Sequence, residues 1–257
     1  MALRVGAALA DGLDALLSER GALVLAAFLV YSLLNTVLLQ SASTAIDRSL
    51  ATVVPDAAQT PQSVAGQSPL ALDVSLGVVL ALLLVMFAVG EALRILAIRT
   101  FASDSDALLG AEVTADLGPT VVTGVAAAVL TTVAIALGSL LFVVPGLVLS
   151  LLFFFVRQEV ALNDSGVMEA VRGSIDLVFE NAVPILALAV VLFVLGVVVT
   201  LPLQVVGIPW PPVFTTLVTT AFSQVVTVFG IAVVTSAYQR VASGRSVAVT
   251  RSIEETF

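Results

Sequence analysis

Long apolar runs separated by short polar segments form the main pattern of this chain. A helix needs about 20 mostly apolar residues to cross a bilayer. Six runs reach or approach that length, near residues 21–41, 74–98, 119–144, 147–162, 182–201 and 213–238. No stretch has a strand pattern. The sequence therefore predicts an all-α integral membrane bundle of six transmembrane helices, with residues 1–257 forming a single membrane domain.

Very few residues join the third and fourth apolar runs. Only Val143-Val144-Pro145-Gly146 separates them, and a Pro-Gly pair is a strong turn signal. The alternative, one continuous helix over residues 119–162, would be too long for a bilayer even when tilted. We therefore expect a tight helical hairpin at the outer face of the membrane.

Three shorter segments have the amphipathic pattern of interfacial helices, near residues 3–19, 104–117 and 165–180. In the third segment, Val167, Val171, Ile175 and Val178 fall on one helical face. These segments form either a cytoplasmic collar that senses or organises lipid, or plain connectors whose apolar faces cover the bundle. The second interpretation is preferred, because their polar faces are acidic and do not favour anionic lipid.

The placement of arginine predicts the orientation of the bundle. With six crossings and both termini on one side, nine of the ten arginines lie at or near that side, and only Arg48 falls on the other. Cytoplasmic loops carry the excess of positive residues in membrane proteins. Both termini are therefore expected in the cytoplasm.

The composition supports a membrane location and adds one expectation about the source. Hydrophobic residues make up 60% of the chain and charged residues only 11%, too few to cover a soluble surface. The ten basic residues are all arginine, and eighteen acids give a net charge of −8. Such an acid excess without lysine is typical of cells with high internal salt, so we expect an extreme halophile, most typically an archaeon. A GC-rich genome would explain the arginines but not the acids. The negative charge also argues against a nucleic-acid partner.

The chain has no cysteine and no histidine. Disulfide and thiolate chemistry is therefore excluded, and the commonest general base and metal ligand is missing. Ser174 and Ser223 have no plausible base beside them, and no glycine-rich phosphate loop follows a strand. The sequence predicts no catalytic residue, no metal site and no cofactor, and hence a protein that is not an enzyme.

Four charged residues fall inside the apolar runs and are the main candidates for a ligand or ion-pair site. Glu91 and Arg94 lie near the inner end of the second run, and Arg157 and Glu159 lie toward the inner end of the fourth. Charges inside a membrane are costly and are default functional candidates. Crossed pairing, Glu91 with Arg157 and Glu159 with Arg94, would neutralise all four. The cluster would either line a polar cavity for a small solute or lipid head group, or, as preferred here, fix the helix register.

A stripe of polar residues at helical spacing runs along the sixth apolar segment: Thr216, Thr220, Gln224 and Thr227. Such a stripe can line a permeation path. More often these side chains bond to their own helix or to a neighbouring one. Packing is therefore the preferred interpretation.

Residues 145–185 resemble the membrane domain of some glycerophosphodiester phosphodiesterases and of related uncharacterised bacterial and archaeal six-helix membrane proteins. The matching features are Pro145-Gly146, Arg157, Ala170-x-x-x-Ser174 and Asn181, with Ala237-Tyr238-Gln239-Arg240 resembling the end of that family's last helix. The resemblance implies the fold and the membrane location. In those enzymes the chemistry resides in a separate soluble barrel with histidines, and this chain has neither, so the resemblance argues against that activity.

These observations lead to two main functional hypotheses, with an intramembrane enzyme ranked below both. The first is a non-catalytic integral membrane protein, a scaffold, accessory subunit or envelope-associated factor, placed in the cell (plasma) membrane. Its expected partners are membrane lipids and other membrane proteins. The alternative is a small transporter or lipid-handling permease that uses Glu91, Arg94, Arg157 and Glu159.

Overall fold

The computed structural model describes residues 3–53, 68–103, 110–205 and 210–254. All regular structure in these ranges is helical. The helices are α1 (Val5–Leu17), α2 (Glu19–Val53), α4 (Leu76–Ala102), α5 (Ala111–Thr114), α6 (Leu117–Leu141), α7 (Val143–Leu152), α8 (Val156–Asn163), α9 (Val167–Glu180), α10 (Ala182–Val205) and α11 (Pro212–Glu254).

Within the described residues, six helical segments are long and apolar enough to cross a membrane, which confirms the predicted all-α class and the count of six membrane-length helices. Five of them lie in single helices: α2, α4, α6, α10 and α11. The fourth, Val143–Asn163, is built from two helices, α7 and α8. Large apolar side chains cover the outside of these segments; Leu140 is 83% exposed and Phe193 is 70% exposed. A surface of this kind suits hydrocarbon and not water.

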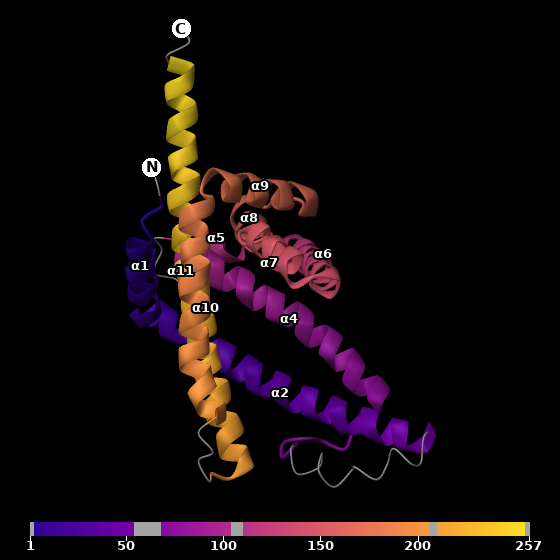
Figure 1. Ribbon diagram of the computed structural model, residues 1–257. Helices are drawn as coiled ribbons and strands as arrows, with labels where there is room; N and C mark the ends of the chain where they lie inside the picture. Colours follow the sequence, from indigo (N-terminus) through magenta and orange to yellow (C-terminus); the bar gives the residue numbers. More distant parts are fainter. Residues whose placement is uncertain (1–2, 54–67, 104–109, 206–209, 255–257) are drawn as a thin grey trace.

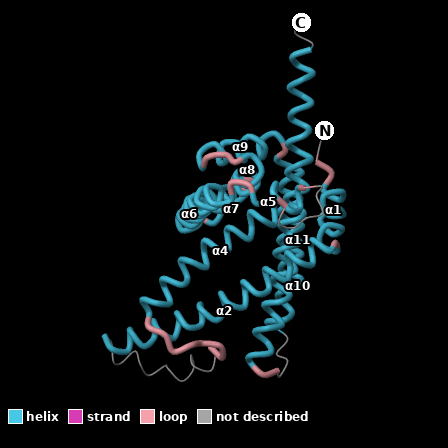
Figure 2. Tube along the Cα trace, turned by 180° about the vertical axis from the view of Figure 1, so that it is seen from behind, coloured by secondary structure: helices cyan, strands magenta, loops and turns pink. Residues whose placement is uncertain are grey.

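The packed core lies at the end of the bundle that holds α1, α9 and the projecting part of α11 (Figure 1). Its largest cluster includes Phe155, Leu177, Ile185 and Val233; Phe155 directly precedes α8, and the others come from α9, α10 and α11. From this end α2 and α4 run together and diverge from the pair α10 and α11 (Figures 1 and 2). The charged side chains of Glu91, Arg99 and Glu159 are also buried, and they belong to this packed end of the bundle.

The hairpin between the third and fourth apolar segments turns earlier than the sequence predicts. Phe142 alone is extended between α6 and α7, so Pro145 and Gly146 lie in the first turn of α7. Proline fits there because the first N–H groups of a helix have no partner within it. Glycine is needed for a different reason: a Cβ on Gly146 would lie 2.9 Å from the Cα of Ser139. The Pro-Gly pair thus serves close packing of the two helices.

α1 packs against the last helix through small residues. Its buried positions are Ala8 and Gly12, and a Cβ on Gly12 would lie 2.9 Å from the backbone nitrogen of Val233 in α11. Leu13 and Leu17 remain 48% and 75% exposed. Val5, Leu9 and Leu16 are partly buried and pack against the core clusters beside these small residues.

α9 covers the ends of α6, α7 and α8 (Figure 1). Its buried face consists of Ala170, Ser174, Leu177 and Val178, and the acidic positions of the segment lie on its exposed side. Of the second expected interfacial segment, residues 104–109 lie outside the described ranges, and the rest contains the four-residue helix α5 and the first residue of α6.

An ion pair fastens α1 to α11. Ser236 donates to the Asp11 carboxylate at 2.6 Å, and Arg240 donates to it from Nη2 at 2.6 Å and from Nε at 3.0 Å. The Ser236 hydrogen bond lowers the pKa of Asp11 below the usual 3.8; partial burial acts in the opposite direction, and Arg240 lowers the pKa further.

This lowered pKa predicts acid-sensitive docking of α1. A carboxyl group with a lowered folded-state pKa stabilises the folded state above its unfolded-state pKa, and this contribution is lost as the pH falls through the folded-state pKa. We expect α1 to loosen below about pH 4. A nitroxide on Ala10→Cys, in a chain without other cysteines, should gain mobility on acidification. Asp11→Asn should abolish this pH response; an unchanged response in that variant would contradict the assignment.

Candidate functional site

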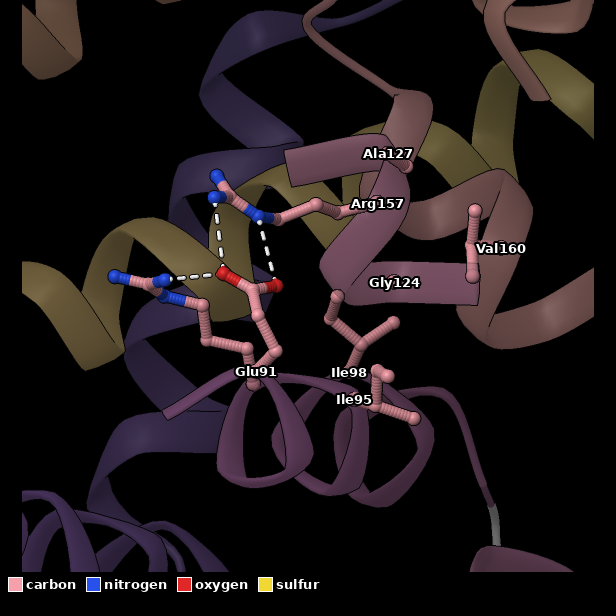
Figure 3. A pocket seen from close by; sticks show the side chains of 8 residues that line it. Glu91, Ile95, Ile98, Gly124, Ala127, Arg157 and Val160 are labelled. Carbon is pink, nitrogen blue, oxygen red and sulfur yellow. Dashed lines mark hydrogen bonds and ion pairs between the residues drawn. The ribbon is translucent and has the colours of Figure 1, made fainter. Parts of the chain in front are cut away.

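Glu91 is the centre of the charged cluster. α4 presents Glu91 and Arg94 one turn apart, and α8 brings Arg157 from the opposite side (Figure 3). Oε1 of Glu91 accepts from Arg94 Nη1 at 2.6 Å and from Arg157 Nη2 at 3.2 Å, and Oε2 accepts from Arg157 Nε at 3.4 Å. The side chain of Glu91 is 1% exposed, whereas those of Arg94 and Arg157 are 35% and 45% exposed.

Apolar and small residues form the wall beside this cluster: Ile95, Ile98, Gly124, Ala127 and Val160 (Figure 3). Gly124 and Ala127 belong to α6, and their small size allows α4 and α8 to approach it. The cavity among these residues has a volume of about 10 Å³. That is space for at most one water molecule.

Glu159 does not join this cluster, and its expected pairing with Arg94 is wrong. Residues two positions apart on a helix differ by about 200° in direction, so Arg157 and Glu159 leave α8 on different sides. Glu159 is 8% exposed and lies against Gly173 of α9. Its Oε2 accepts from Asn163 Nδ2 at 2.7 Å, and the same nitrogen lies 2.7 Å from the hydroxyl oxygen of Tyr238. Glu159 therefore contributes to the contact of α8 with α9 and α11.

A break in the fourth membrane segment was not apparent in the sequence. α7 ends at Leu152 and α8 begins at Val156; the N–H of Phe153 still bonds to the carbonyl of Leu149, but other backbone groups at this junction lack regular helical partners. Ser174 of α9 replaces two of them: its hydroxyl donates to the carbonyl oxygen of Leu152 at 2.7 Å and accepts from the N–H of Phe155 at 3.1 Å. Ser174 is fully buried. The Ala170-x-x-x-Ser174 pattern was the available signal, because small residues at i and i+4 mark a helix face in close contact.

Arg99 is a second feature that sequence analysis missed. Its guanidinium makes five hydrogen bonds, as many as it has N–H groups. The acceptors are Ala161 O at 2.7 Å, Val113 O at 3.3 Å, Ala115 O at 2.5 Å, Thr120 Oγ1 at 3.2 Å and Asp164 Oδ1 at 2.7 Å. Arg99 is 8% exposed and thus joins α4, the segment before α6, and the end of α8. Asp164 ends α8 at φ 49°, a left-handed conformation that aspartate tolerates better than most residues.

Two of the four residues in the polar stripe of the last helix bond to the backbone of that helix. Thr216 donates to Pro212 O at 3.0 Å and Thr227 donates to Ser223 O at 2.8 Å. Thr220 and Gln224 are half-buried on the same helix. This arrangement agrees with packing within the bundle. Among the residues that the structure describes, no three His, Cys, Asp or Glu side chains are grouped so as to hold a metal ion.

Comparison with the curated proteins and with the solved structures gives no match. A family model with the description Domain of unknown function (DUF7847) matches residues 3–241. The matched range includes the Glu91 cluster, Arg99 and the helix break at Ser174. Because the match extends over most of the sequence, the chain belongs to the DUF7847 family.

Proposed function

We propose that this protein is a non-catalytic integral membrane protein that acts as a scaffold or accessory subunit for other membrane proteins. It lies in the cell membrane with both termini in the cytoplasm, where α1 and α9 cover the inner end of the bundle. Six apolar helices support the membrane location. The clustering of nine of ten arginines toward one side supports the orientation.

The observation that carries this proposal is the small volume of the cavity beside the membrane-embedded charges. Glu91 is paired with both Arg94 and Arg157, and the cavity beside them has space for at most one water molecule. A carrier needs a chamber for its solute near the middle of the membrane. In the described part of the chain, the charged groups instead join α4 to α8.

A larger hollow of about 220 Å³ lies beside Arg99 and Asp164. It offers no free guanidinium donor, because Arg99 already makes five hydrogen bonds within the protein. The hollow therefore lacks the charged donors that would select an anionic solute. The hollow is therefore a surface depression that does not support the transporter hypothesis.

Two measurements on the full chain test the scaffold proposal. After cross-linking in native membranes, a membrane-protein partner should copurify at a fixed molar ratio in several detergents. Vesicles that contain the purified chain should be as impermeable to ions and small solutes as protein-free vesicles. A chain that purifies alone and supports a solute flux reduced by Glu91→Gln would overturn the proposal in favour of a transporter.

The topology can be tested with single cysteines because the chain has none of its own. Ser75 precedes α4 and Thr114 ends α5, and both are exposed. In intact cells, a membrane-impermeant maleimide should label Ser75→Cys. It should label Thr114→Cys only after the cells are permeabilised. The reverse labelling pattern would overturn the assigned orientation.

A further inference from the structure

The Glu91 cluster carries more positive than negative charge. Two guanidinium groups, those of Arg94 and Arg157, meet the single carboxylate of Glu91, which leaves one net positive charge. The carboxylate is buried, but 35% and 45% of the two arginine side chains are exposed. The surplus charge is therefore at the surface of the bundle, where a ligand can reach it.

Most hydrogen-bond donors of these two arginines are also available. Within the described ranges, Arg94 donates only through Nη1, and Arg157 donates through Nε and Nη2, in every case to Glu91. A guanidinium has five N–H groups. In the same protein, the guanidinium of Arg99 makes five hydrogen bonds, which use all of its N–H donors, and the side chain is only 8% exposed. Arg94 and Arg157 differ from it in both respects.

The position of the cluster along the helices determines which anions can reach it. Arg94 lies eight residues before the end of α4, about 12 Å along the axis. Arg157 lies six residues before the end of α8, about 9 Å along the axis. Both guanidinium groups are held at the Glu91 carboxylate, one turn of α4 further from that end. Arg94 itself lies 18 residues after the start of α4, about 27 Å along the axis, and the hydrocarbon core of a bilayer is about 30 Å thick. In the proposed orientation, the cluster therefore lies near the boundary between the hydrocarbon and the inner lipid head groups.

We propose that Arg94 and Arg157 together bind the phosphate group of an anionic phospholipid in the cytoplasmic leaflet. Planar guanidinium groups bind phosphate oxygens through paired, charge-assisted hydrogen bonds. Glu91 occupies one N–H donor of Arg94 and two of Arg157 and leaves their other donors free. Free phosphate offers the same chemistry, but a site on the membrane-facing surface is reached by the lipid. The inference relies on the proposed topology and is independent of the scaffold role.

The test uses the detergent-purified full chain and native mass spectrometry. The probes are phosphatidylglycerol, phosphatidylcholine, diacylglycerol and inorganic phosphate, each added separately. We expect retention of phosphatidylglycerol above the other three, because only this probe combines acyl chains with a net negative phosphate. Arg94→Gln and Arg157→Gln should each weaken its retention about fivefold, since one basic residue near a membrane surface contributes about 1 kcal/mol. In each variant Glu91 keeps one cationic partner, so the buried carboxylate remains compensated.

Two further variants separate binding from folding. Glu91→Gln raises the net charge of the cluster by one, so phosphatidylglycerol retention should increase even where thermal stability decreases. Arg48→Gln removes a positive charge near the C-terminal end of α2, on the side of the membrane opposite to the cluster. Arg48 pairs there with exposed Asp73, so this substitution should leave phosphatidylglycerol retention unchanged. Equal retention by the wild type and both arginine variants would overturn the proposal. So would equal retention of diacylglycerol, or binding of inorganic phosphate without phosphatidylglycerol.

Discussion

Arg99→Leu is expected to lower the free energy of unfolding by about 3–5 kcal/mol, the cost of removing one partner from a buried, hydrogen-bonded charge network. The substitution removes five hydrogen bonds and leaves the carbonyl groups of Val113 and Ala161 without their donor. SDS titration of the protein in mixed micelles, followed by helical circular dichroism, measures the effect.

Two further variants provide reference values for this loss in the free energy of unfolding. Arg99→Lys keeps the charge but has fewer donors in a different geometry, so its loss should be intermediate. Arg48→Gln breaks an exposed ion pair and should change the free energy of unfolding by no more than about 1 kcal/mol. If Arg48→Gln and Arg99→Leu cost the same, the five-bond network would not be a principal support of the bundle.

Ser174→Ala is expected to lower the free energy of unfolding by about 2 kcal/mol, because it leaves buried polar groups unpaired. The affected groups are the N–H of Phe155 and the carbonyl of Leu152, which the Ser174 hydroxyl joins across the break between α7 and α8. The same SDS titration applies. Hydrogen exchange should also become faster at the Phe155 amide, a local effect that general destabilisation would not confine to this position.

Ser150 provides the matched control for this prediction. It lies on α7 and is exposed, and its hydroxyl donates to the carbonyl of Leu147 within the same helix. Ser150→Ala should therefore change the free energy of unfolding by about 0.5 kcal/mol or less. Similar losses for the two serines would mean that the break does not depend on α9.

The charged candidates show how far pairing can be inferred from sequence. Glu91 and Arg94 are one turn apart on a single helix, so their proximity follows from helical geometry. The expected pair of Glu91 with Arg157 is present in the structure. The expected pair of Glu159 with Arg94 fails because α8 directs Arg157 and Glu159 to different neighbours. Which side of α8 faces α4 depends on how the helices pack together.

The hairpin and the helix break illustrate a related difficulty. The Pro-Gly pair correctly indicated a turn near residue 145, but Phe142 makes the turn and Gly146 serves close packing. The break after Leu152 is satisfied by a hydroxyl that lies 22 residues further along the chain. Local propensity contains no information on such a partner, because the hydrogen bond forms only once α9 is in place.

The sequence by itself determined the helical class, the six membrane-length segments and the location of the charged residues along them. These properties depend on the length of apolar runs, since backbone groups in hydrocarbon must be satisfied within each helix. Only the tertiary structure decided that Arg99 joins three segments, that Glu159 contacts α9 and α11, and that Arg94 and Arg157 retain free donors at the surface. These features depend on the rotation and depth of each helix against its neighbours, which close packing of side chains determines.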